Sequence, residues 1–313
     1  MVDDRREPDI HARWALSHET LNRYHSVGGD ESREALEAVN GKAAMRTVSV
    51  CLVGMLLLAS AIAPIGAGFD AGNETPVIDS IELRSPATDD SPWPWRQLIE
   101  DTQIPESVTL TVPLIAQNPE LPNGCEVTSL TMLLQYLGYD IDHETLAFDY
   151  MPQGEVVWTD EEVLVPNPET TYVGNPADFS GFYILVPGLV ETANAYLRER
   201  DTGVRGINLT GIDRDGISKF LAQGMPVVTW VTMGYDDVDY LEDVIWTIGD
   251  TGEMINPYGN LHCVLVIGYD SENVIVNNPL EDTIEQVPWD EFMHSFDELG
   301  DRAMTVVNTT AIG

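Results

Sequence analysis

The chain has 313 residues, of which 52 are acidic and 15 basic, so its formal net charge is −37. Its hydrophobic fraction of 43% is that of a globular protein and argues against a disordered or collagen-like chain. The acidity argues against nucleic acid as a partner, because binding DNA or RNA requires basic surface. Three cysteines are too few for a disulfide scaffold. A surface with this charge repels itself, so we expect a soluble, salt-tolerant and monomeric C-terminal domain.

The N-terminal part combines a polar segment with an apolar one. Residues 1–46 are polar, and residues 47–69 read TVSVCLVGMLLLASAIAPIGAGF, without a single charge. A helix of this length, at about 1.5 Å per residue, spans a hydrocarbon core of about 30 Å. Lys42 and Arg46 precede it, and basic flanks stay in the cytoplasm. We therefore predict a single-pass membrane anchor with the C-terminal part at the cell surface. A cleaved signal peptide, with secretion of the remainder, is the alternative.

The rest of the chain divides into a linker and a domain. Residues 70–107 are acidic and contain SPATDDSPWPWRQ, which is typical of an extracellular stalk that docks partly on its neighbour. Residues 108–313 are then expected to form one compact domain.

The domain opens with elements that place a cysteine at the start of a helix. The alternating run from Val108 to Ile115 predicts a strand, and a Pro- and Gly-rich loop follows from Gln117 to Gly124. A helix is predicted from Cys125 to Leu137, with Gly138 as its C-terminal cap. Its apolar residues have the i, i+3, i+4, i+7 spacing of an amphipathic helix: Leu130, Leu133, Leu134 and Leu137. The positive end of the helix dipole favours a thiolate at Cys125, although Glu126 opposes it slightly.

A nucleophilic cysteine requires a base, and His262 is the best placed of the six histidines. Three others fall within residues 1–46, across the predicted membrane, while His143 lies in a polar segment and His294 in a predicted C-terminal helix. His262 begins the apolar run 262–269, and residues 273–278 form the return strand of a hairpin. Residues 225–233 complete the predicted antiparallel sheet. Because adjacent strand residues face opposite sides, either Asn277 or Asn278 shares the face of His262, depending on the register.

The order Cys, His, Asn supplies the three parts of activated nucleophilic catalysis. The imidazole takes the thiol proton, and the asparagine carbonyl holds the other ring N–H. Gln117 and the backbone N–H of Cys125 are candidate donors to an oxyanion. A disulfide between Cys125 and Cys263 would abolish the nucleophile. It is disfavoured because strand alternation turns Cys263 away from the face of His262.

Three stretches together resemble the C39-like peptidases, within the papain-like cysteine protease superfamily. They are QNPELPNGCEVTSL (117–130), Met151-Pro152 with GNPAD (174–178), and His262 through Pro279. The resemblance covers roughly residues 108–295. It implies an α+β papain-like fold in which the helix that carries the cysteine packs on an antiparallel sheet. It also implies roles for four residues: Cys125 as nucleophile, His262 as general base, Asn278 as the residue that orients it, and Gln117 in the oxyanion hole. The family commonly has Asp where Asn278 stands, so the base is expected to be weaker.

These observations predict a membrane-anchored extracellular cysteine peptidase or amide hydrolase that forms a thioester acyl-enzyme. Its expected substrate is a peptide or a wall-peptide crosslink. Two alternatives remain open, namely an acyl or amide transferase that uses the same triad and an inactive binding domain at the cell surface. No cofactor or metal is expected, because the chain contains no HExxH motif, no paired cysteines and no EF-hand spacing.

Overall fold

The computed structural model describes residues 95–308 except residues 160, 201–202 and 242–243. The helices are α3 (Trp95–Leu98), α4 (Cys125–Tyr136), α5 (His143–Thr145), α6 (Val186–Arg198), α7 (Arg214–Ala222) and α8 (Trp289–Glu298), with a π-helical turn η1 (Leu146–Tyr150) and a 3₁₀ turn η2 (Met233–Tyr235). The main-sheet strands are β1 (Val108–Thr109), β6 (Val204–Asn208), β7 (Val227–Thr232), β10 (Leu261–Tyr269), β11 (Asn273–Asn278), β12 (Thr283–Pro288) and β13 (Ala303–Asn308). The remaining strands are β2 (Gln153–Gly154), β3 (Val157–Trp158), β4 (Val163–Val165), β5 (Tyr172–Val173), β8 (Trp246–Ile248) and β9 (Met254–Ile255).

The main sheet is antiparallel throughout and has seven strands in the order β12-β11-β10-β7-β13-β6, with β1 paired to β10. Two smaller sheets, β2-β5 and β3-β4-β8-β9, lie apart from it. The predicted strands at 225–233, 262–269 and 273–278 are all observed as neighbours in this sheet. The α+β prediction is therefore confirmed.

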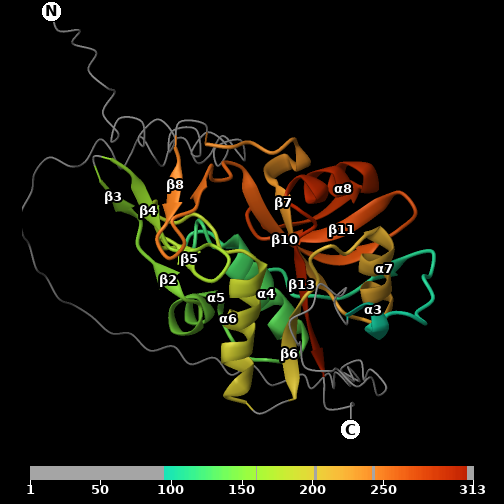
Figure 1. Ribbon diagram of the computed structural model, residues 1–313. Coiled ribbons are helices and arrows are strands. Elements are labelled where there is room, and N and C mark those ends of the chain that lie inside the picture. Colours follow the sequence, from blue (N-terminus) through green and yellow to red (C-terminus); the bar gives the residue numbers. More distant parts are fainter. Residues whose placement is uncertain (1–94, 160, 201–202, 242–243, 309–313) are drawn as a thin grey trace, which may run out of the picture. The chain divides into compact units, whose positions relative to one another are not determined.

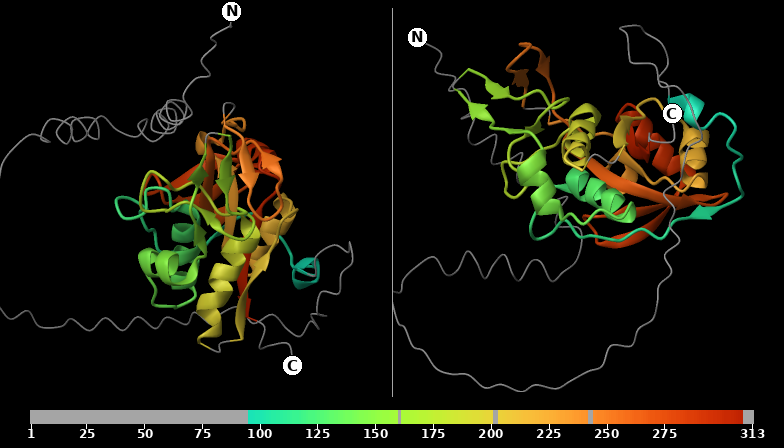
Figure 2. Two further views of the ribbon diagram at one scale, coloured as in Figure 1. Left: turned by 60° about the vertical axis from the view of Figure 1, so that its left-hand side comes forward. Right: turned by 90° about the horizontal axis from the view of Figure 1, so that it is seen from below.

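Helices cover both faces of the main sheet (Figures 1 and 2). Along β10, Cys263 and Leu265 belong to a core shared with α4 and α6, whereas Val264 and Val266 belong to a core shared with α3, α7 and α8. A strand covered on both faces reads as a continuous apolar run, and all nine residues of β10 are buried.

The helix α4 closely matches its predicted bounds. Its first ten residues are all buried, so it lies within the core rather than on the surface. Gly138 has φ +88°, a conformation that glycine adopts without a Cβ penalty, and its N–H donates to the carbonyl of Gln135. The predicted C-terminal cap is thus confirmed.

The first predicted strand is shorter than its sequence pattern indicates. Val108 and Thr109 pair in register with β10, and the N–H of Leu110 donates to the carbonyl of Ile267 at 2.8 Å before the chain leaves the sheet. Pro113, which has no N–H to donate, lies beyond this end. Pairing here requires a close approach, since a Cβ on Gly268 would lie 2.5 Å from the carbonyl oxygen of Val108. A side chain at position 268 would therefore separate the two strands.

The end of the predicted linker packs on the domain. Trp95, Leu98 and Ile99 are buried in the core that includes α7 and α8, and the amide of Gln223 donates to the carbonyl of Leu98 at 2.9 Å. The predicted polar segment 1–46, the predicted anchor 47–69 and linker residues 70–94 lie outside the described residues. None of the helices within the described part has the length and apolar character that a membrane crossing requires.

Candidate active site

Cys125 is the first residue of α4, and a tightly turned loop leads to it. The N–H of Leu121 donates to the carbonyl of Gln117, and the N–H of Gly124 donates to the carbonyl of Leu121, each at 2.8 Å. Gly124 is the N-cap and supplies no side-chain acceptor. The first N–H groups of α4 therefore receive no hydrogen bond from an N-cap side chain.

The environment of the Cys125 thiol favours its neutral form. The side chain is buried, and its Sγ donates to Oε2 of Glu126 at 3.3 Å. Burial, followed by repulsion from Glu126, raises the pKa of Cys125 well above its usual value, although the backbone N–H of Cys263 lowers it somewhat. The helix N-terminus alone predicted a stabilised thiolate. The desolvation produced by folding outweighs that effect, so the thiol must lose its proton to a base when it reacts.

Glu126 is a fully buried carboxylate beside the thiol. Its Oε1 accepts the N–H of Ile184 at 3.1 Å, and burial raises its pKa to about 7. The sequence identified Glu126 only as a slightly unfavourable charge. Its burial follows from the packing of α4 on β10 and on the segment before α6, which helical periodicity does not reveal.

His262 and Asn278 are in direct contact. The Nε2 atom of His262 lies 2.9 Å from Oδ1 of Asn278, and both residues are buried. The register explains the choice between the two asparagines. Asn277 pairs with Leu265 on the α4 side of the sheet, where its amide donates to the carbonyl of Pro113, so Asn278 takes the other face.

Two further side chains extend this contact. The amide of Asn278 donates to Oε1 of Glu285 at 2.9 Å, and the hydroxyl of Tyr235 donates to Oε2 of the same carboxylate at 3.1 Å. The N–H of Leu280 donates to Oδ1 of Asn278 at 3.0 Å. Sequence reasoning did not identify Glu285 or Tyr235, because neither lies near His262 in the chain.

Gln117 is tied to the end of the asparagine strand. Its backbone N–H donates to the carbonyl of Pro279 at 2.8 Å, and its side-chain Nε2 donates to the carbonyl of Pro122 at 2.7 Å. Its Oε1 is buried and accepts no hydrogen bond from the residues that the structure describes. The loop before Cys125 and the strand after His262 are thus joined at Gln117.

Cys263 occupies the core beneath α4. It is fully buried, and burial raises the pKa of its thiol. Cys125 and Cys263 are both free thiols. Between residues 95 and 308, outside the gaps given above, no three His, Cys, Asp or Glu side chains are grouped to hold a metal.

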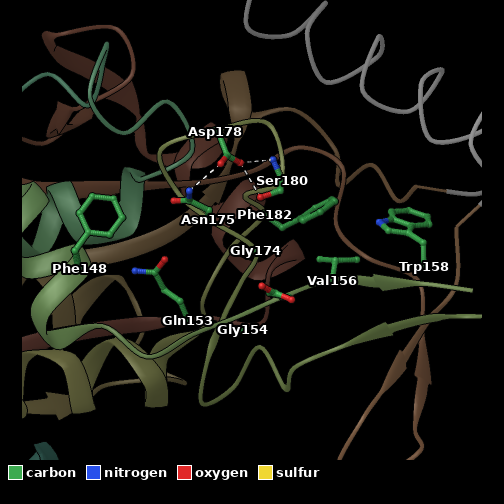
Figure 3. A pocket seen from close by; sticks show the side chains of 11 residues that line it. Phe148, Gln153, Gly154, Val156, Trp158, Gly174, Asn175, Asp178, Ser180 and Phe182 are labelled. Atoms are coloured by element: carbon green, nitrogen blue, oxygen red, sulfur yellow. Dashed lines mark hydrogen bonds between the residues drawn. The ribbon is translucent and has the colours of Figure 1, made fainter.

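The described domain contains a cavity of about 530 Å³. Its lining comes from η1, from residues 153–158 and from the loop 174–182. Figure 3 shows Phe148 and Trp158 on opposite sides of the view, with Asp178 between them. The sequence indicated the GNPAD segment of this loop only through the family resemblance.

Comparison with known proteins shows the family of the chain. Residues 109–304 match the Peptidase_C39 like family, well over half of the chain. The chain belongs to this family. Its sequence is 29% identical over 188 residues to the uncharacterized protein YvpB of Bacillus subtilis (strain 168), which covers 60% of this chain and 70% of YvpB. Its structure is similar to that of a protein assigned as a C39-like peptidase from Bacillus anthracis. The two share 33% identity with a TM-score of 0.56, over 65% of this chain and 98% of the other.

Membership of the C39-like peptidase family identifies the chain as a cysteine peptidase. The predicted family and the predicted enzyme class are both confirmed. Within the described domain, Cys125 and Cys263 are the cysteines available as nucleophile, and the chemical setting differs between them. Cys125 begins α4 and is 7% exposed, whereas Cys263 lies within β10 and is fully enclosed.

Proposed function

We propose that this C39-like peptidase hydrolyses peptide amides through Cys125, His262 and Asn278. The observation that carries the proposal is the 2.9 Å contact between Nε2 of His262 and Oδ1 of Asn278, next to the Cys263 amide that reaches the Cys125 thiol. The asparagine then orients the ring, and the remaining nitrogen, Nδ1, serves as the base.

Attack and proton transfer are coupled in this mechanism. Because the pKa of Cys125 is raised, the thiol is neutral before substrate arrives. His262 takes the thiol proton as Sγ forms a bond to the amide carbon. The carbonyl oxygen becomes an oxyanion, and the backbone N–H of Cys125 with the second N–H of the Gln117 amide donate to it.

His262 transfers a proton both when the acyl-enzyme forms and when water hydrolyses it. The protonated imidazole gives its proton to the departing amine as the C–N bond breaks, which leaves a thioester on Cys125. Water then attacks the thioester carbon while His262 accepts its proton. The C–S bond breaks, the proton returns to the sulfur, and a carboxylic acid leaves.

The test uses the full chain in detergent and a library of fluorogenic peptides. We expect turnover by the wild type and its loss in Cys125→Ala and His262→Ala, with Cys263→Ala as the matched cysteine control that retains activity. Mass spectrometry of the wild type, quenched in acid, should detect an acyl adduct on the peptide that contains Cys125. An adduct on Cys263, or equal turnover by Cys125→Ala, would refute the proposal. Release of an amide rather than an acid when amines are added would establish a transferase.

The location of the domain is also part of this proposal. The uncharged segment 47–69, with Lys42 and Arg46 before it, supports an anchor that leaves the domain at the outer surface, where a peptide or a wall peptide is the substrate. Protease added to intact cells should degrade the domain and spare residues 1–46. Protection of the domain until the cells are lysed would contradict this topology.

A further inference from the structure

The loop 174–182, which lines the cavity of Figure 3, also contacts the segment that carries the proposed nucleophile. Asn123, two residues before Cys125, donates its backbone N–H to the carbonyl of Pro176 at 3.0 Å and its side-chain amide to the carbonyl of Asp178 at 2.8 Å. The hydroxyl of Tyr172 donates to the carbonyl of Asn123 at 2.6 Å. The loop that lines the cavity is therefore anchored two residues before Cys125.

The loop is preorganised rather than shaped by a ligand. Gly174 has φ +83°, and a Cβ there would lie 1.7 Å from the carbonyl oxygen of Ser180. The backbone of Asn175 also approaches Gly181 closely, since a Cβ on Gly181 would lie 2.3 Å from the carbonyl oxygen of Asn175. These two glycines allow the ends of the loop to pack backbone against backbone. The protein alone therefore sets the shape of this wall of the cavity, without a bound ligand.

The cavity has apolar and aromatic walls on more than one side. It is lined by the side chains of Phe148, Val156, Trp158 and Phe182, and Phe148 is 49% exposed. Apolar walls bind the methylene stem of a long side chain, and aromatic faces attract a cation.

The same cavity also carries negative charge. Oδ1 of Asp178 accepts the N–H and the hydroxyl of Ser180, and Oδ2 accepts the amide of Asn175 (Figure 3). These bonds lower the pKa of Asp178, so it is ionised at neutral pH. A carboxylate has about four acceptor positions, so Asp178 retains capacity for a ligand. Glu155 adds a second carboxylate, and no Lys or Arg side chain is among the lining residues.

We propose that this cavity is a substrate subsite for a basic side chain with an aliphatic stem, such as lysine. The inference rests on the proposed peptidase function and specifies its substrate. The apolar and aromatic walls of the cavity suit the stem, and its carboxylates suit the ammonium. The net charge of −37 draws cationic peptides toward it.

The experiment compares peptides that differ at one position, with lysine, norleucine or glutamate placed in turn at each residue around the scissile bond. For the full chain we expect one position at which kcat/KM for lysine exceeds that for norleucine by about tenfold, with glutamate poorest. Glu155→Gln and Phe148→Ala should each reduce the lysine-to-norleucine ratio at that position. Glu161→Gln, which removes an equally exposed charge outside the cavity, should leave the ratio unchanged.

The experiment distinguishes an error in the proposed subsite from an error in the proposed peptidase activity. Cleavage of all three peptides at equal rates, or an unchanged ratio in Glu155→Gln and Phe148→Ala, overturns the subsite and leaves the peptidase intact. Binding tests the subsite without turnover. Calorimetry should detect the lysine peptide bound to full-length Cys125→Ala more tightly than to the double variant with Glu155→Gln, and equal affinities would refute the subsite.

Discussion

Asn278 and Glu285 are diagonal neighbours across the hairpin of β11 and β12, and the amide of Asn278 donates to Oε1 of Glu285 at 2.9 Å. A carboxylate accepts hydrogen bonds only, so it fixes which end of the asparagine amide points toward it. The carbonyl Oδ1 must then face His262 and accept from Nε2, which leaves Nδ1 of the ring to act as the base. A negative charge also stands one hydrogen bond behind the asparagine, in partial compensation for the aspartate that the family commonly has there.

The first prediction concerns Glu285. Its replacement by Ala should lower kcat/KM by about tenfold, because the amide of Asn278 can then rotate and present its NH₂ to His262. Glu285→Gln should lower kcat/KM by less, since the side-chain carbonyl of the glutamine still accepts a hydrogen bond from the amide of Asn278. The pH profile of kcat/KM distinguishes this effect from simple loss of structure, because the charge behind the asparagine stabilises imidazolium. Equal losses in Glu285→Ala and in Glu281→Gln, an exposed acid of the same hairpin, would contradict it.

The second prediction concerns the thiol. In Glu126→Gln the carbonyl can still accept the N–H of Ile184, while the NH₂ donates to Sγ where a carboxylate stood. Burial still raises the pKa of Cys125, but the added repulsion from Glu126 disappears. Alkylation of Cys125 at pH 8, where Glu126 of the wild type is mostly ionised, should therefore become about ten times faster. Labelling with iodoacetamide followed by mass spectrometry measures the alkylation rate of Cys125, and Cys263 in the same samples serves as the internal reference. An unchanged rate at Cys125 would show that Glu126 does not control the thiol.

The third prediction follows from the raised pKa of Glu126, about 7 in the folded protein against 4.5 normally. The folded state then holds a proton that the unfolded chain has lost. This stabilisation is fully present below about pH 4.5 and disappears as the pH rises through 7. Its size is on the order of 3 kcal/mol. Urea unfolding at pH 5.5 and 8 should show Glu126→Gln gaining stability relative to the wild type at the higher pH. A constant difference between the two proteins would refute the shift.

The fourth prediction separates two costs of replacing glycine in the cavity loop. Gly174 and Gly211 have nearly equal φ values, +83° and +82°, but a Cβ would meet backbone at Gly174 and nothing within 4 Å at Gly211. Gly211→Ala should therefore cost about 1 kcal/mol for the conformation alone. Gly174→Ala should cost at least about 2 kcal/mol more, as the loop must open. Thermal unfolding measures both, and equal melting temperatures would contradict the close approach.

The local elements could be predicted from the sequence. The leucine spacing placed a helix at Cys125, and the apolar run after His262 gave a strand that proved to be central to the sheet. Gly138 was recognised as a helix end because its role depends only on its own backbone. These features are set by residues within one or two turns of each other, where periodicity is informative.

The partners of the candidate site were decided by tertiary structure. The residues alone left Asn277 and Asn278 as equal candidates, and the register across β10 and β11, with its irregularity between Val266 and Gly268, placed Asn278 against His262. Glu285 reaches that asparagine only because β12 folds back beside β11.

The burial of individual side chains likewise could not be predicted from the sequence. The sequence pattern is that of an exposed acidic residue in the first turn of a helix. In the structure α4 lies within the core, so the carboxylate of Glu126 is buried and accepts a hydrogen bond from the thiol of Cys125. The cavity wall depends on contacts between Asn123 and Asp178, which are 55 residues apart. Chain-local patterns determine which elements form and which face is apolar. The charge state of a buried group depends on which distant residues exclude water from it, and that is set when the elements pack.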